Sequence, residues 1–115
     1  MEKFLLLIRE DLKVRDQLTP EEFDKSIQVM TLWMESLAQS GNLVSSEPLQ
    51  KSGKYVSRDY VLSDGPFIEA KEAISGYFLI NAENEEQAAS IAQTCPLVLN
   101  ATGVIEVRPI MLLNK

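Results

Sequence analysis

Charged side chains follow one another closely in the segment from residue 64 to residue 72. Asp64 precedes Gly65-Pro66, and Glu69 and Lys71 come soon after it. A carboxylate at the mouth of a pocket can act as a general base, and a nearby cation can stabilise the negative charge that develops. No catalytic residue is assigned from the sequence, but Asp64 and Glu69 are the candidates. The structural alternatives are a turn at Asp64 and a charged edge strand beyond it.

Two further residues with binding chemistry lie later in the chain. Tyr77 could donate its phenolic hydroxyl to a ligand, or it could be a core tyrosine with its hydroxyl at the rim. Arg108 could bind a ligand carboxylate bidentately, or it could form a cross-strand ion pair, since Glu106 has the same parity. The candidate ligand-binding residues are therefore Asp64, Phe67, Glu69, Lys71, Tyr77 and Arg108. Arg9 and Glu47, near predicted strand ends, are further candidates for this cluster.

Metal and cofactor chemistry lack their usual residues in this sequence. There is no histidine, and Cys95 is the single cysteine, so no metal-ligand spacing exists. No phosphate-binding glycine loop and no nucleophile elbow occurs. Cys95 has no neighbouring histidine or lysine to favour a thiolate, which argues against a reactive thiol. We therefore expect neither a metal nor a cofactor.

Length and charge limit the classes of protein to which the chain can belong. Its 115 residues, 45% of them hydrophobic, predict a single globular domain over residues 1–115. The net charge of −6 disfavours direct contact with nucleic acid or an anionic membrane. The apolar run at residues 4–8 is too short for a signal peptide or a membrane span. Together with the single cysteine, these features predict a cytoplasmic protein.

The elements that must position these residues follow from local patterns. Thr19-Pro20-Glu21-Glu22 is a capping box with proline in the first turn, and it predicts a helix over residues 20–40. Asn84-Glu85-Glu86-Gln87 begins a second helix, which Pro96 ends. Strands are predicted at residues 4–8, 43–49, 55–62, 74–82 and 103–109, with a polar hairpin turn at 51–54, a turn at 64–66 and a further short strand at 67–71.

This β-α-β-β-α-β order predicts an α+β, ferredoxin-like antiparallel sheet with both helices on one face. Trp33, in the first of these helices, is expected to be a core residue. Residues 4–8 and 77–80 are apolar at both parities, whereas a sheet with one face in water should alternate. The second face therefore needs a partner, and a homodimer with sheet facing sheet is the simplest one.

The segment Asp64-Gly65-Pro66-Phe67-Ile68-Glu69-Ala70-Lys71-Glu72, followed by Gly76-Tyr77-Phe78-Leu79-Ile80, resembles the signature of the DGPF proteins of the YCII-related family. Leu18-Thr19-Pro20-Glu21-Glu22, Cys95-Pro96 and Gly103-Val104-Ile105-Glu106-Val107-Arg108-Pro109 extend the likeness along the chain. The resemblance implies a dimeric α+β barrel and no settled activity. Because DGPF proteins are often encoded beside extracytoplasmic-function sigma factors, it also implies a sigma-factor-linked regulatory role.

Some YCII-related proteins carry a histidine on the first helix and an aspartate before a late proline, proposed as an acid/base pair. The resemblance places Met30 and Cys95 at these two positions, so the pair is missing here. This absence favours a regulatory dimer that binds a small, anionic molecule, or a protein partner, over catalysis. The alternatives are a purely structural role and a cofactor-free lyase or isomerase. In the enzyme, Asp64 or Glu69 would be the base, and Lys71 or Arg108 would stabilise negative charge.

Overall fold

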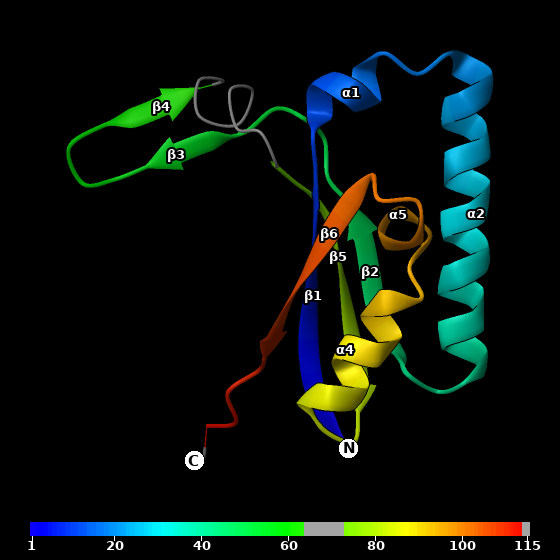
Figure 1. Ribbon diagram of the computed structural model, residues 1–115. Helices are drawn as coiled ribbons and strands as arrows, with labels where there is room; N and C mark the ends of the chain where they lie inside the picture. The colour runs from blue at the N-terminus through cyan, green and yellow to red at the C-terminus, as the bar shows by residue number, and fades with distance from the viewer. Residues whose placement is uncertain (64–72, 114–115) are drawn as a thin grey trace.

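The computed structural model of the protein describes residues 1–63 and 73–113 (Figure 1). The turn predicted at residues 64–66 and the short strand predicted at 67–71 lie outside these ranges. Within them, the chain forms one four-stranded sheet, a separate two-stranded hairpin and helices packed against the larger sheet.

The four-stranded sheet is antiparallel throughout. Its strands are β1 (Glu2–Glu10), β2 (Leu43–Pro48), β5 (Ala73–Ala82) and β6 (Gly103–Pro109), and they lie in the order β2-β5-β1-β6. The two long apolar strands, β1 and β5, are the inner pair, and the shorter β2 and β6 form the edges. This order is the ferredoxin-like arrangement predicted from the sequence.

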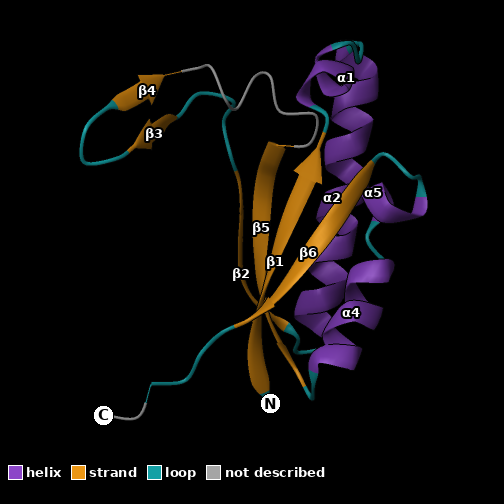
Figure 2. Cartoon of the chain, turned by 60° about the vertical axis from the view of Figure 1, so that its left-hand side comes forward, coloured by secondary structure: helices purple, strands orange, loops and turns teal. Residues whose placement is uncertain are grey.

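The two predicted helices, α2 (Pro20–Gln39) and α4 (Glu85–Gln93), cover one face of this sheet (Figures 1 and 2). The capping box of α2 is present, because the Glu22 amide donates to Thr19 Oγ1 at 3.1 Å and the Thr19 amide donates to Glu22 Oε1 at 2.8 Å. Two short helices, α1 (Leu12–Asp16) and α5 (Pro96–Leu99), were not predicted. Pro96 therefore not only follows α4 but also begins α5.

The core lies between the sheet and its helices. Trp33 of α2 packs on Phe78 of β5, with ring centroids 4.7 Å apart, and its indole donates to Thr94 Oγ1 at 2.8 Å. The prediction that Trp33 is a core residue is confirmed, because its indole finds a partner and its rings are buried. The remaining buried members of this cluster are Phe4, Leu6, Ile8, Leu37, Ile80, Ala82, Ala88, Ala92 and Cys95.

The strand predicted at residues 55–62 is wrong. This stretch instead forms two short strands, β3 (Lys54–Val56) and β4 (Val61–Ser63), which pair with each other outside the main sheet. The cause is a turn around Ser57. The Ser57 hydroxyl accepts hydrogen bonds from the amides of Asp59 and Tyr60, and the Ser57 amide donates one to the Tyr60 carbonyl. The turn predicted at 51–54 consequently joins β2 to this hairpin rather than pairing two strands of the main sheet.

Two segments extend from the sheet on the side opposite the helices (Figures 1 and 2). One is the β3–β4 hairpin, residues 54–63, in which every residue is exposed. The other is residues 110–113, which follow β6 and which we call the C-terminal arm. These extensions account for a radius of gyration of 15.5 Å, above the roughly 13 Å expected of a compact domain of about 100 residues.

Candidate functional site

The face of the sheet turned away from the helices carries both apolar and charged side chains. Opposite residues of an antiparallel pair share a face, and Leu7 of β1 is opposite Tyr77 of β5 and Glu106 of β6. In the next row, Leu5 is opposite Leu79 and Arg108. We call this surface the open face and define it by Leu5, Leu7, Arg9, Tyr77, Leu79, Glu106 and Arg108.

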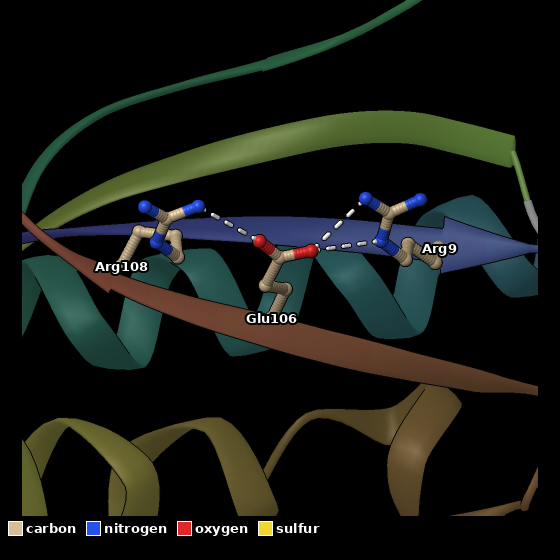
Figure 3. A network of polar contacts seen from close by, with 3 residues as sticks. All are labelled: Arg9, Glu106 and Arg108. Carbon is tan, nitrogen blue, oxygen red and sulfur yellow. Dashed lines mark hydrogen bonds and ion pairs between the residues drawn. The ribbon is translucent and has the colours of Figure 1, made fainter.

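Three charged side chains of the open face form one network (Figure 3). Arg9 donates to Glu106 Oε1 from Nη2 at 2.9 Å and from Nε at 3.1 Å, and Arg108 donates from Nη1 to Glu106 Oε2 at 3.2 Å. The two guanidinium groups approach the carboxylate from opposite sides, as Figure 3 shows. Arg9 and Glu106 are half-buried, whereas the Arg108 side chain is 65% exposed and is the accessible cation of the network.

Electrostatics in the network keep the carboxylate ionised. The hydrogen bonds from Arg9, and secondarily those from Arg108, hold the pKa of Glu106 below its ordinary value. Glu106 therefore serves as an anchor between two cations rather than as a proton donor near neutral pH. Since two positive charges surround one negative charge, the network leaves an excess positive charge on a protein whose net charge is −6.

A cavity of about 280 Å³ adjoins the network where β1 ends and α1 begins. Its lining is Arg9, Glu10, Asp11, Val14 and residues 101–104. The Glu10 carboxylate accepts a hydrogen bond from the hydroxyl of Ser75, a buried polar residue of β5. Asp11 is occupied by local structure, because its side chain accepts from the Lys13 amide at 2.9 Å and caps α1.

The family of the chain is decided by its match to the YCII-related domain, which spans residues 3–114. The chain belongs to the YCII-related family. An uncharacterized protein of Rhizobium meliloti (strain 1021) is 32% identical over 59 residues, covering 51% of this chain and 48% of that protein. The match thus spans about half the length of this curated relative.

A solved structure shares the fold of this YCII-related protein. It is the 5-chloro-2-hydroxyhydroquinone dehydrochlorinase TftG from Burkholderia phenoliruptrix AC1100, in complex with 2,5-dihydroxybenzoquinone. The likeness has a TM-score of 0.58 and a sequence identity of 12%, and it covers 95% of this chain and 93% of the other. At this identity the likeness establishes a common α+β fold and carries no residue roles across.

The structure places the predicted site residues in two groups. Tyr77 and Arg108 both lie on the open face, while Asp64, Phe67, Glu69 and Lys71 lie outside the described residues. Ala73, where the described chain resumes, pairs with Glu10 at the end of β1 that lines the cavity.

The neighbours expected from the sequence are arranged differently from the prediction. The cross-strand ion pair with Glu106 is made by Arg9, whereas Arg108 reaches Glu106 along the same strand. Glu47 does not join them, because β2 places it opposite Tyr77 on the other side of β5. Gly76 permits this close approach of β2, since a Cβ there would meet the Glu47 carbonyl oxygen at 3.0 Å.

Sequence reasoning missed the pair formed by Glu10 and Ser75. Ser75 is one of the few polar residues in the apolar strand β5, and Glu10 ends β1, two residues after its apolar part. Either position is unremarkable alone, and only the pairing of β1 with β5 brings the two together. A register irregularity near Ile8 and Arg9 accompanies this contact.

The positions that the resemblance assigns to the acid/base pair are neighbours in this YCII-related protein. Cys95 Sγ lies 3.9 Å from Met30 Sδ; Cys95 is a buried member of the core, and Met30 of α2 packs against it. Burial raises the pKa of the Cys95 thiol, so the thiol stays protonated. Two sulfur atoms in an apolar setting provide no acid/base catalysis.

The described residues include neither a metal-ligand cluster nor a membrane-spanning helix. Over residues 1–63 and 73–113, no group of three or more histidine, cysteine, aspartate or glutamate side chains is placed to hold a metal ion. No helix in the described part of the chain is long and apolar enough to cross a membrane.

Proposed function

We propose that this YCII-related protein is a homodimer in which the open faces of two copies enclose a cleft that binds a small organic anion. The observation that carries the proposal is the Arg9–Glu106–Arg108 network on an otherwise largely apolar sheet face. On a protein of net charge −6, two arginines on one sheet face provide a local positive site that can attract a small anion.

The dimer is supported by the composition of the open face. Leu5, Leu7, Tyr77 and Leu79 are half-buried in one copy, so each retains apolar surface in contact with water. Stacked sheets pack about 10 Å apart, a distance at which such side chains interdigitate. A twofold pair covers both faces with the same residues, and it is the commonest arrangement of soluble oligomers.

The anion is supported by the unused capacity of Arg108. A guanidinium has five N–H donors in a planar arrangement, and Arg108 donates to the Glu106 carboxylate from Nη1. The exposed remainder of this guanidinium suits a carboxylate or a phenolate. Leu5 lies directly opposite Arg108, so the hydrocarbon part of an organic anion has an apolar surface beside the charge.

Binding without turnover is supported by the sulfur pair formed by Met30 and Cys95. The two positions proposed as an acid/base pair in some relatives hold Met30 and Cys95 here. A regulatory role, which the resemblance to DGPF proteins implies through sigma factors, needs binding alone. Since Cys95 is a buried free thiol, a reducing compartment suits the chain, and we propose the cytoplasm as its location.

A thermal-shift screen of small aromatic and aliphatic carboxylates and phenolates tests this function. A ligand present at 100 times its Kd stabilises the folded protein by about 2.7 kcal/mol, which is a shift of several degrees. The shift should persist in Lys25→Met, which removes an exposed positive charge from α2, and vanish in Arg108→Met. Equal shifts in the two variants would refute the anion site.

The second candidate, a cofactor-free lyase or isomerase, is favoured by one observation. Glu10 and Arg9 both line the cavity, so it offers a carboxylate and a guanidinium to one bound molecule. If this candidate is correct, a compound found by the screen is converted, as one-dimensional NMR would report. Glu10→Gln should then abolish turnover and retain binding. Asp64→Asn and Glu69→Gln, which change the bases expected from the sequence, are compared in the same assay.

A further inference from the structure

The C-terminal arm is a run of large apolar side chains held in solvent. Met111 is 79% exposed, Leu112 is 83% exposed and Leu113 is 70% exposed. The arm leaves the sheet at a defined place, because the Ile110 amide donates to the Lys3 carbonyl at 3.0 Å. Contiguous apolar surface of this kind marks an interaction site in proteins that stay soluble.

An apolar groove of about 350 Å³ runs along β6 beside α4 and α5. Ile105 and Val107 of β6, Ala89 and Ala92 of α4 and Val98 of α5 form most of its lining. β6 is an edge strand, and its outer edge has no other strand beside it within the described sheet. An open edge next to an apolar groove is a suitable place for an extended apolar segment to bind.

The arm and the groove of one copy are turned away from each other. Ile105 and Val107 are opposite Ile8 and Leu6, so the groove lies toward the helix-covered side of β6. The arm instead extends from the end of β6 to the side opposite the helices (Figure 2). A second copy that faces the open face would lie in the path of the arm.

The length of the arm suits this second copy. An extended chain advances about 3.3 Å per residue, so four residues span about 13 Å. Two stacked sheets are separated by about 10 Å, and the arm is therefore long enough to pass from one sheet to the edge of the facing one. Its apolar side chains match the apolar lining of the groove.

We infer that the C-terminal arm of one copy binds in the β6–α4 groove of a second copy, and that the second copy returns the contact. The inference rests on the proposed homodimer and extends it, because it identifies a second contact region outside the open faces. The exchange covers the exposed apolar side chains of both arms and occupies the two open β6 edges. It also joins the copies by segments that are distant from the Arg9–Glu106–Arg108 network.

Disulfide trapping between two differently tagged chains tests the exchange. One chain carries Leu112→Cys on the arm, and the other carries Ala89→Cys on the exposed surface of α4 in the groove. After co-expression and mild oxidation, a cross-linked pair of chains should form in severalfold excess over the control. The native Cys95 does not compete, because its thiol is buried.

The matched control replaces Ala89→Cys by Glu21→Cys, an exposed position in the first turn of α2. Equal cross-linking in the two pairs would overturn the exchange. So would an internal disulfide in a single chain carrying both Leu112→Cys and Ala89→Cys, since the arm would then occupy its own groove. Sedimentation of the unmodified protein separates the two proposals. A dimer that lacks the specific cross-link would refute only the arm exchange, whereas a monomer would refute the homodimer as well.

Discussion

Replacement of Leu7 by lysine should dissociate the proposed dimer and leave each copy folded. Leu7 is half-buried at the middle of the open face, directly opposite Tyr77 and Glu106. In a single copy, the new ammonium group lies across from the Glu106 carboxylate, and opposite charges on directly opposed positions are favourable. In the dimer, the same ammonium group enters an apolar interface, where burying a charge is costly.

The expected magnitude follows from the burial of Leu7 and from symmetry. Full burial of a leucine side chain contributes about 1.5–3 kcal/mol, and because Leu7 is already half-buried, the dimer adds about 1 kcal/mol for each copy. Because the dimer is symmetric, the substitution is present in both copies. About 2 kcal/mol of association free energy is therefore lost, which raises Kd about 30-fold. Desolvation of two ammonium groups adds to this minimum.

Sedimentation velocity over a dilution series measures the change. Leu32→Lys is the matched control, because Leu32 is 64% exposed on α2 and the substitution alters the net charge equally. Far-ultraviolet circular dichroism checks that both variants are folded. If Leu7→Lys and Leu32→Lys dissociate over the same concentration range as the unmodified protein, the open face is not the interface. A monomeric unmodified protein would refute the dimer itself.

Two further predictions concern the core and the ion network. Ile80→Ala removes a fully buried side chain and should lower the free energy of unfolding, measured in urea, by about 2–5 kcal/mol. The control is Ile27→Ala at a 48% exposed position, which should lower it by less than about 1 kcal/mol. Similar losses in the two variants would contradict the assigned core. Because the pKa of Glu106 is lowered in the folded state, its contribution to stability is complete above the ordinary value of 4.5 and is lost as the pH falls through the lowered pKa. Titration by carbon-13 NMR should give a larger rise of the Glu106 pKa in Arg9→Gln than in Arg108→Gln, since Arg9 is the larger cause, and the reverse order would contradict the network.

Elements defined by short-range patterns could be predicted from the sequence. The α2 capping box depends on residues three positions apart, and the apolar runs of β1 and β5 are continuous in the chain. Their order also limits the topology, because hairpin and crossover connections of these lengths favour few arrangements. The ferredoxin-like sheet and the core position of Trp33 could therefore be predicted from the sequence.

The hairpin β3–β4 shows where local reasoning was insufficient. Residues 55–62 have strand-forming composition, and the turn that divides them is made by one serine hydroxyl rather than by glycine or proline. A serine is common inside strands as well as in turns, so its identity does not mark a break. Short helices such as α1 are equally difficult to predict, because five residues contain little periodicity.

The sequence by itself determined the α+β architecture, the absence of histidine chemistry and the surplus of apolar residues on both faces of the central strands. Only the tertiary structure decided which charged residues form the candidate site. Arg9 and Glu106 are 97 positions apart, and they meet because the β1–β6 register places Glu106 opposite Leu7, two residues before Arg9 on the same face. A shift of that register by one residue would place Glu106 on the helix-covered side. Register depends on the packing of the whole core, so a contact between two distant strands cannot be read from either strand alone.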